Sequence, residues 1–168
     1  VDGDGDLDAF VANSSNQANK VWLNNGSGAF SDSGQSLGSS YSLGVSLGDV
    51  DGDGDLDAFV ANYDQANKVW LNNGSGSFSD SGQSLGSSWS EHASLGDLDG
   101  DGDLDAFVNN RSQGNKVWLN GLSIISKTPA ANALDVRKTS NIVVQFSATI
   151  SGTTINAITF NVDGSISG

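Results

Sequence analysis

The sequence predicts an all-β fold, namely a partial β-propeller of about two and a half four-stranded blades followed by the beginning of a β-sandwich. Three observations support this. One unit occurs three times at a spacing of about 48 residues, each copy consists of short β-prone runs joined by Gly- and Asn-rich turns, and no window shows a helical period with caps. Four strands in ~45 residues is the size of one propeller blade.

Two sequence blocks define the repeat. Copies of VDGDGDLDAFVAN or LDGDGDLDAFVNN begin at Val1, Val50 and Leu98. Copies of NKVWLNNGSG or NKVWLNG begin at Asn19, Asn67 and Asn115. Repeats of this length are typical of solenoids and propellers.

The second copy shows the four expected strands. Residues 56–60 and 68–71 are β-prone runs. The Asn-Gly pair within residues 72–76 predicts a hairpin that leads to Phe78. In the next copy, residues 94–96 lead into the acidic stretch and predict an inner strand.

Neither end of the repeat region forms a whole blade. The first copy lacks the inner strand and the third lacks the outer one, whereas a closed ring needs at least four blades. The chain also opens in the middle of a motif and contains no methionine. We therefore expect an internal fragment whose remaining blades come from the full-length chain.

A second domain is expected at residues 122–168, where the repeat is absent. Thr128-Pro129 marks a boundary, and residues 141–146 and 155–162 read as strands. Forty-seven residues are too few for a complete β-sandwich, so this segment is expected to be the start of one.

The formal charge of −13 argues against a nucleic-acid partner, because phosphate binding needs clustered Lys and Arg. Fourteen of the 20 acidic residues fall within residues 2–8, 49–57 and 97–105. Crowding carboxylates in this way is costly unless a cation neutralises them. The absence of cysteine excludes disulfides and thiolate metal sites, and no apolar run is long enough for membrane insertion.

The acidic stretches have the spacing of a calcium loop. Carboxylates at positions 1, 3 and 5 can converge on one ion, and a glycine at position 6, Gly54 or Gly102, permits the sharp turn. Position 7 offers a backbone carbonyl, and position 9 closes the site. The predicted ligands of two complete sites are Asp49, Asp51, Asp53, Asp55 and Asp57, and Asp97, Asp99, Asp101, Asp103 and Asp105. The first copy lacks position 1 and leaves Asp2, Asp4, Asp6 and Asp8 for a weaker, open site.

Other interpretations of these loops fit less well. An EF-hand needs a Glu at position 12, where Val60 and Val108 stand, and a calcium-binding β-helix needs a GGxGxD run that is absent. Magnesium prefers a rigid octahedron and retains its waters. Plain solvated Asp-Gly turns are disfavoured by five carboxylates in nine residues and by the repetition of the pattern.

The unit SLGDVDGDGDLDAFVAN resembles the FG-GAP or VCBS repeat, which is found in integrin α-chain propellers and in large bacterial surface proteins. The resemblance covers residues 1–121 and implies a calcium-binding loop between the first two strands of each blade. It also implies about seven blades, from which this chain departs. Residues 122–168, with SKTPAANALDV and NIVVQF, are similar to the opening of bacterial Ig-like modules.

No catalytic centre is predicted. Residues 34–38, 44–48 and 82–86 match the G-x-S-x-G pattern, but no helix follows any of them and the chain has one histidine. The repeated tryptophans are interpreted as packing residues between blades.

The copies differ mainly in two sets of connections, which join strands two and three and lead from strand four to the next blade. Both are expected on the face opposite the acidic loops. The candidate ligand-binding residues there are Tyr63, Trp89, Glu91, His92 and Arg111. Variable aromatic loops on a rigid scaffold suit binding, although neutral variation in loops explains them equally well.

The sequence thus favours a calcium-binding extracellular or bacterial cell-surface module for adhesion or for binding a carbohydrate or protein ligand. A non-catalytic accessory domain of a secreted polysaccharide-degrading or other hydrolytic enzyme is the alternative. A spacer in a long surface protein is a third possibility.

Overall fold

The computed structural model describes residues 1–121, 124–128 and 143–146. The chain divides into two compact units, Val1–Gly121 and Leu122–Gly168. The described residues contain no helix, and therefore none that is long and apolar enough to cross a membrane. The all-β prediction is confirmed for this part of the chain.

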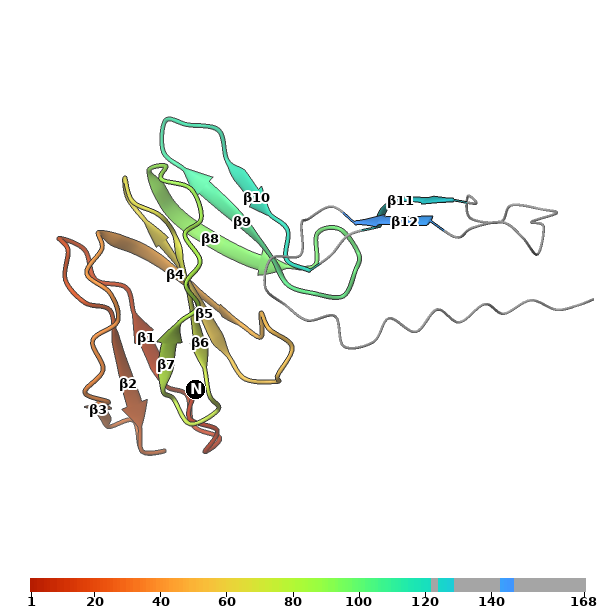
Figure 1. Ribbon diagram of the computed structural model, residues 1–168. Coiled ribbons are helices and arrows are strands. Elements are labelled where there is room, and N and C mark those ends of the chain that lie inside the picture. The colour runs from red at the N-terminus through yellow and green to blue at the C-terminus, as the bar shows by residue number, and fades with distance from the viewer. Residues whose placement is uncertain (122–123, 129–142, 147–168) are drawn as a thin grey trace, which may run out of the picture. The chain divides into compact units, whose positions relative to one another are not determined.

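The first unit consists of three antiparallel sheets in which strands adjacent in sequence are also adjacent in space (Figure 1). Sheet 1 contains β1 (Ala9–Val11), β2 (Lys20–Asn24) and β3 (Phe30–Asp32). Sheet 2 contains β4 (Ser42–Gly48), β5 (Asp57–Asn62), β6 (Lys68–Asn72) and β7 (Phe78–Asp80). Sheet 3 contains β8 (Ser90–Gly96), β9 (Asp105–Asn110) and β10 (Lys116–Trp118). Within the described residues, sheet 1 has no inner strand and sheet 3 has no outer strand, as predicted for the first and third copies.

The predicted hairpin between β6 and β7 has an Asn-Gly turn. The backbone amide of Asn73 donates to the carbonyl of Ser77 at 3.2 Å, and the Asn73 side-chain oxygen accepts from the Ser75 amide at 3.1 Å. Gly74 and Gly76 both have positive φ, which a side chain would oppose. The turn thus depends on local residue types that the sequence already displays.

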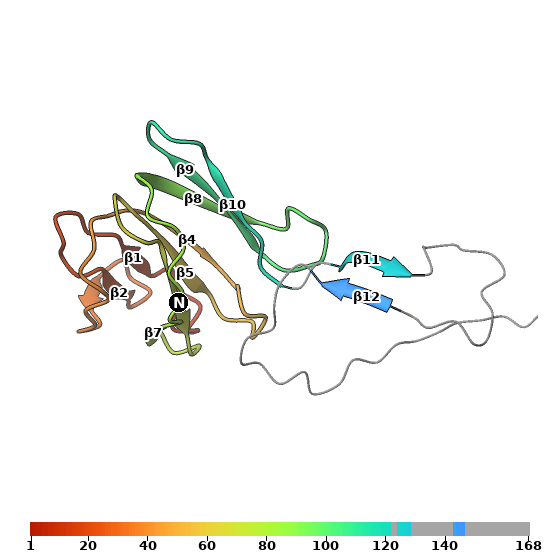
Figure 2. The same cartoon turned by 45° about the horizontal axis from the view of Figure 1, so that its top comes forward.

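Sheets 1 and 2 pack face to face over an apolar core. Phe10 and Val21 of sheet 1 lie in one cluster with Val60, Trp70 and Phe78 of sheet 2. The rings of Phe10 and Phe78 meet edge to face with their centroids 5.3 Å apart. Figure 1 and Figure 2 show sheet 2 lying between the other two sheets.

Sheet 2 also packs on sheet 3, through its opposite face. Phe59 and Val69 form a second cluster with Ala106 and Val108, and Trp118 lies against it. Side chains alternate along a strand, so β5 sends Val60 to one neighbouring sheet and Phe59 to the other. All six residues of β5 are buried for this reason. The interpretation of the repeated tryptophans as packing residues between sheets is confirmed for Trp70 and Trp118.

Neighbouring inner strands approach each other closely at a glycine. A Cβ atom on Gly44 of β4 would lie 2.7 Å from the carbonyl oxygen of Glu91 on β8. Gly44 pairs with Ala61, as His92 pairs with Asn109 in the next sheet, so the two positions are equivalent. Glycine is required at position 44 because a further inner strand covers it.

The second unit contains the antiparallel pair β11 (Ile124–Thr128) and β12 (Val143–Phe146). The strand predicted at residues 141–146 is confirmed over Val143–Phe146. The strand β11 was not predicted, because a five-residue run that includes Lys127 gives little pattern of its own. The strand predicted at residues 155–162 lies outside the described residues.

Phe78 and Phe30 occupy the same position in two repeats but differ in exposure, 7% against 50%. We predict that Phe78→Ala lowers the free energy of unfolding by about 3 kcal/mol or more, because it leaves a cavity beside Phe10. Phe30→Ala should lower it by less than about 1 kcal/mol. Urea unfolding of dilute protein, followed by tryptophan fluorescence, measures both values, and equal losses would contradict the packing described above.

Candidate metal centre

The three acidic loops share one backbone conformation. In the second and third loops, Gly52 and Gly100 have φ near +80°, while Gly54 and Gly102 have φ values of 94° and 98°. The first loop repeats the pattern at Gly3 and Gly5. Both glycines of each D-G-D-G-D run therefore occupy the left-handed region, where other residues are strained. The sequence pattern pointed only to the second of them.

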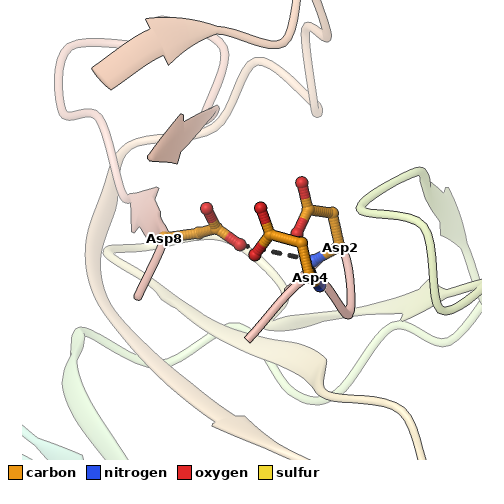
Figure 3. Close-up of side chains that lie close together, drawn as sticks. All are labelled: Asp2, Asp4 and Asp8. Atoms are coloured by element: carbon orange, nitrogen blue, oxygen red, sulfur yellow. Dashed lines mark hydrogen bonds between the residues drawn. The ribbon is translucent and has the colours of Figure 1, made fainter. Parts of the chain in front are cut away.

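Each loop brings three carboxylates together, with oxygen atoms that lie within 4.8 Å of one another. The three groups are Asp2, Asp4 and Asp8; Asp49, Asp51 and Asp53; and Asp97, Asp99 and Asp101. Figure 3 shows the first group, in which the carboxylates of Asp4 and Asp8 approach each other beside Asp2. The predicted convergence of positions 1, 3 and 5 occurs in the second and third loops, and positions 3, 5 and 9 converge in the first.

Backbone amides of the loop orient these carboxylates. In the second loop, Asp49 accepts from the amides of Gly52 at 2.8 Å and Gly54 at 3.0 Å. Asp53 accepts from the amide of Asp55 at 2.9 Å. The third loop repeats the arrangement, with Asp97 accepting from the amides of the two equivalent glycines. The backbone of each loop thus positions the carboxylates of that same loop.

The aspartate at position 9 has a second role that the sequence did not reveal. Asp57 is fully buried, and its two oxygens accept from the amides of Val50 at 3.0 Å and Asn72 at 2.8 Å. Asp105 is equally buried and accepts from the amides of Leu98 and Asn120. This carboxylate connects the start of the loop to the end of the third strand. Its partners are backbone groups, which leave no trace in a residue pattern.

The carboxylates at position 7 lie outside the three groups. Asp55 lies against the turn after β6, where a Cβ atom on Gly74 would come within 2.6 Å of its Oδ2 atom. Asp103 lies against Gly121 in the same way, and Asp6 against Gly26. The side chain at position 7 therefore packs on the neighbouring turn, in keeping with a prediction that assigned only its backbone carbonyl to an ion.

The crowding of carboxylates in the acidic loops affects the pKa values of two aspartates. Burial and then the negative charges of Asp57 and Asp53 raise the pKa of Asp51 above its usual value. A hydrogen bond from the Asp103 amide lowers the pKa of Asp101, but burial and the surrounding carboxylates outweigh it, so that this pKa is also raised. A cation in these loops would relieve the repulsion that raises both pKa values.

The family comparison agrees with this geometry. A family model described as FG-GAP-like repeat matches residues 1–60 and 49–108. The chain belongs to the FG-GAP-like repeat family. Each match begins in one acidic loop and extends through the next, so the loops delimit the FG-GAP-like unit. No curated protein matches the chain.

FG-GAP-like repeats often bind calcium, are typical of extracellular or surface proteins, and are generally non-catalytic. The three aspartate groups of this FG-GAP-like chain can hold a metal ion, because each offers only oxygen donors at close range.

The candidate ligand-binding residues lie at the other ends of the same strands. Tyr63 follows β5 and Trp89 precedes β8, whereas the acidic loops precede β5 and follow β8. The rings of Tyr63 and Trp89 stack with their centroids 5.2 Å apart, and Tyr41, which was not among the predicted residues, lies 5.7 Å from Tyr63. The indole of Trp89 donates to Asp64 at 3.2 Å.

The charged members of the set form an exposed pair. The Arg111 Nε atom lies 3.9 Å from a carboxylate oxygen of Glu91. His92 is exposed on β8, at the position that glycine occupies in β4. The structure thus brings the two aromatic residues into contact and pairs Glu91 with Arg111.

Asp57 and Asp53 should respond differently to substitution in a metal-free buffer with chelator. We predict that Asp57→Ala lowers the free energy of unfolding by about 2–4 kcal/mol, because the amides of Val50 and Asn72 lose their acceptor. Asp53→Ala should change it by less than about 0.5 kcal/mol, since Asp53 is exposed. Asp105→Ala and Asp101→Ala provide the same comparison in the third loop. Chemical denaturation measures the four values, and equal losses within a pair would refute the anchoring role of position 9.

Proposed function

We propose that this chain is a calcium-binding part of an extracellular β-propeller, in which sheets 1, 2 and 3 are successive blades. One observation carries the proposal. A group of three converging carboxylates recurs in all three repeats, in a loop that leads into β1, β5 or β9. The proposed role of the chain is that of a rigid module for adhesion or for ligand binding at the cell surface.

The donor set fits calcium. Calcium takes six to eight oxygens in flexible geometry, and it tolerates the short, curled loop better than magnesium does. The carboxylates of Asp49, Asp51 and Asp53 would hold the ion in the second repeat, together with the carbonyl of Asp55. Asp57 uses both oxygens for amide hydrogen bonds, yet a carboxylate oxygen has lone pairs for more than one partner.

The proposed role of calcium is structural. It neutralises carboxylates that otherwise repel one another, and so fixes the loop that precedes β1, β5 or β9. A ligand at about 100 times its Kd adds ~2.7 kcal/mol of stability per site, provided that the unfolded chain does not bind it. The ion would also hold the strands whose far ends carry the aromatic residues.

The proposed ligand surface is the end of the sheets opposite the acidic loops. Tyr63, Trp89, Glu91, His92 and Arg111 gather there, and Tyr41 and Asp64 extend the patch. Aromatic faces beside polar groups suit sugars or peptide side chains. A non-catalytic accessory role in a secreted polysaccharide-degrading enzyme would use the same surface. We also propose that the repeats are of the VCBS type and that residues 122–168 begin an Ig-like module.

We predict that calcium binds to the second and third loops with a Kd of about 10⁻⁴–10⁻³ M, the range of extracellular modules. Isothermal calorimetry should show that Asp53→Ala and Asp101→Ala each remove about one ion. The melting temperature should fall in chelator for the wild type.

Asp80→Ala is the matched control, because Asp80 is an exposed carboxylate that pairs with Lys68 outside the loops. It should leave the stoichiometry unchanged. An unchanged stoichiometry in the loop variants, or identical melts in chelator and in millimolar calcium, would refute the calcium assignment.

For the ligand surface, we predict that binding on a glycan or matrix-protein array is weakened about tenfold or more by Trp89→Ala and by Tyr63→Ala. Leu56→Ala is the control, since Leu56 is an exposed apolar residue in the acidic loop that precedes β5, whereas Tyr63 follows that strand. If both test variants keep the wild-type affinity and melt, the ligand site lies elsewhere.

A further inference from the structure

Hydrogen bonds through one asparagine join the acidic loops of neighbouring sheets. Asn120 follows β10, and its side-chain amide donates to the carbonyl oxygen of Val50 in the second loop at 2.6 Å. Its backbone amide donates to a carboxylate oxygen of Asp105, at position 9 of the third loop, at 2.7 Å. A single residue therefore contacts both loops.

The same connection occurs one sheet earlier. Asn72, at the end of β6, donates through its side chain to the carbonyl oxygen of Val1 in the first loop at 2.9 Å. Its backbone amide donates to Asp57 of the second loop at 2.8 Å. Asn72 and Asn120 hold equivalent positions in the repeat, as do Val1 and Val50. The connection is therefore a property of the repeat and not of one turn.

The position-9 carboxylates continue this path of hydrogen bonds. Asp57 accepts from the backbone amides of Val50 and Asn72. The carbonyl of Val50 in turn accepts from Asn120, which leads to Asp105 of the third loop. Both carboxylates are fully buried, so water does not compete with their partners. A displacement of Val50 therefore acts on two hydrogen bonds of the path, one toward each neighbouring loop.

We infer, on the basis of the calcium function proposed above, that Asn120 couples the second and third loops, so that an ion in one strengthens binding in the other. When Asp49 and Asp51 hold an ion, the peptide of Val50 between them is fixed. The side chain of Asn120 then has a fixed acceptor, and its backbone amide holds Asp105 in place. The third loop has less freedom left to lose when it binds its own ion, which gives positive cooperativity.

Electrostatics acts on the two loops in the opposite direction. A cation in one loop removes negative charge that would attract a cation to the other. This effect passes largely through solvent, and at about 1 M salt it is screened within about 3 Å. Hydrogen bonds between buried groups are screened much less. We therefore expect the positive coupling to increase with salt concentration.

The test is a calcium titration of the 168-residue chain by NMR, in which the amides of Gly54 and Gly102 report the second and third loops separately. It is carried out at about 0.15 M and about 1 M potassium chloride. Asp53→Ala disables the second loop. A coupling of about fivefold should then raise the calcium concentration that half-saturates the third loop about twofold. Titration of Asp101→Ala should return the same coupling factor for the second loop, because coupling is reciprocal.

Asn120→Ala removes the side-chain contact with Val50 and should abolish the coupling at the higher salt concentration. Asn120→Asp has nearly the same shape but no side-chain donor, and it should have the same effect. Because the coupling factor compares one loop with its neighbour intact or disabled, a general weakening of both loops does not change it. Asn24→Ala is the matched control, since Asn24 is the equivalent residue of sheet 1 and its side chain accepts from the amide of Gly28. It should retain the wild-type coupling.

The possible failures are distinguishable. Independent binding to the two loops of the wild type at the higher salt concentration, or coupling that survives both Asn120 variants, would overturn this inference and leave the calcium function intact. Loss of coupling in Asn24→Ala would overturn the specific role of Asn120. If neither loop binds calcium, the proposed function is wrong and this inference fails with it. Circular dichroism of each variant establishes that it is folded.

Discussion

The buried carboxylate at the start of the second strand, Asp57 in the second repeat, is the contact on which both the core and the acidic loop depend. It accepts from one amide at the start of the loop and from another at the end of the third strand. Two hydrogen bonds to a charged group in a buried position are strong, and their loss is costly. The loop is therefore attached to the most buried strand of the sheet.

The two ends of β5 therefore have different roles. The end of β5 that carries Asp57 joins the acidic loop, whose sequence is almost the same in every repeat. The other end leads to Tyr63 and the variable connections. Because the strand between them is buried on both faces, its two ends are held at a fixed separation. An ion bound at one end would stabilise the scaffold that presents the other.

Stacking of sheets explains why the repeats are not identical. Gly44 is small because β8 lies over it, and His92 is tolerated because no further inner strand covers β8 on the side away from β4 within the described residues. The exposure of Trp22, compared with that of Trp70, has the same origin. In a stack of similar sheets, the position in the stack determines the environment of a residue, and end sheets expose what internal sheets bury.

The sequence by itself determined the all-β class, the strands of the repeat, the spacing of the carboxylates and the Asn-Gly hairpin, because each depends on residues close together in the chain. The tertiary structure decided which groups meet across sheets. It placed Asp57 between two backbone amides, brought Tyr41 to Tyr63 and left Trp22 uncovered. A sequence pattern does not reveal backbone partners, because every residue other than proline supplies an amide. It does not reveal neighbouring sheets either, because the same face is buried or exposed according to what packs against it.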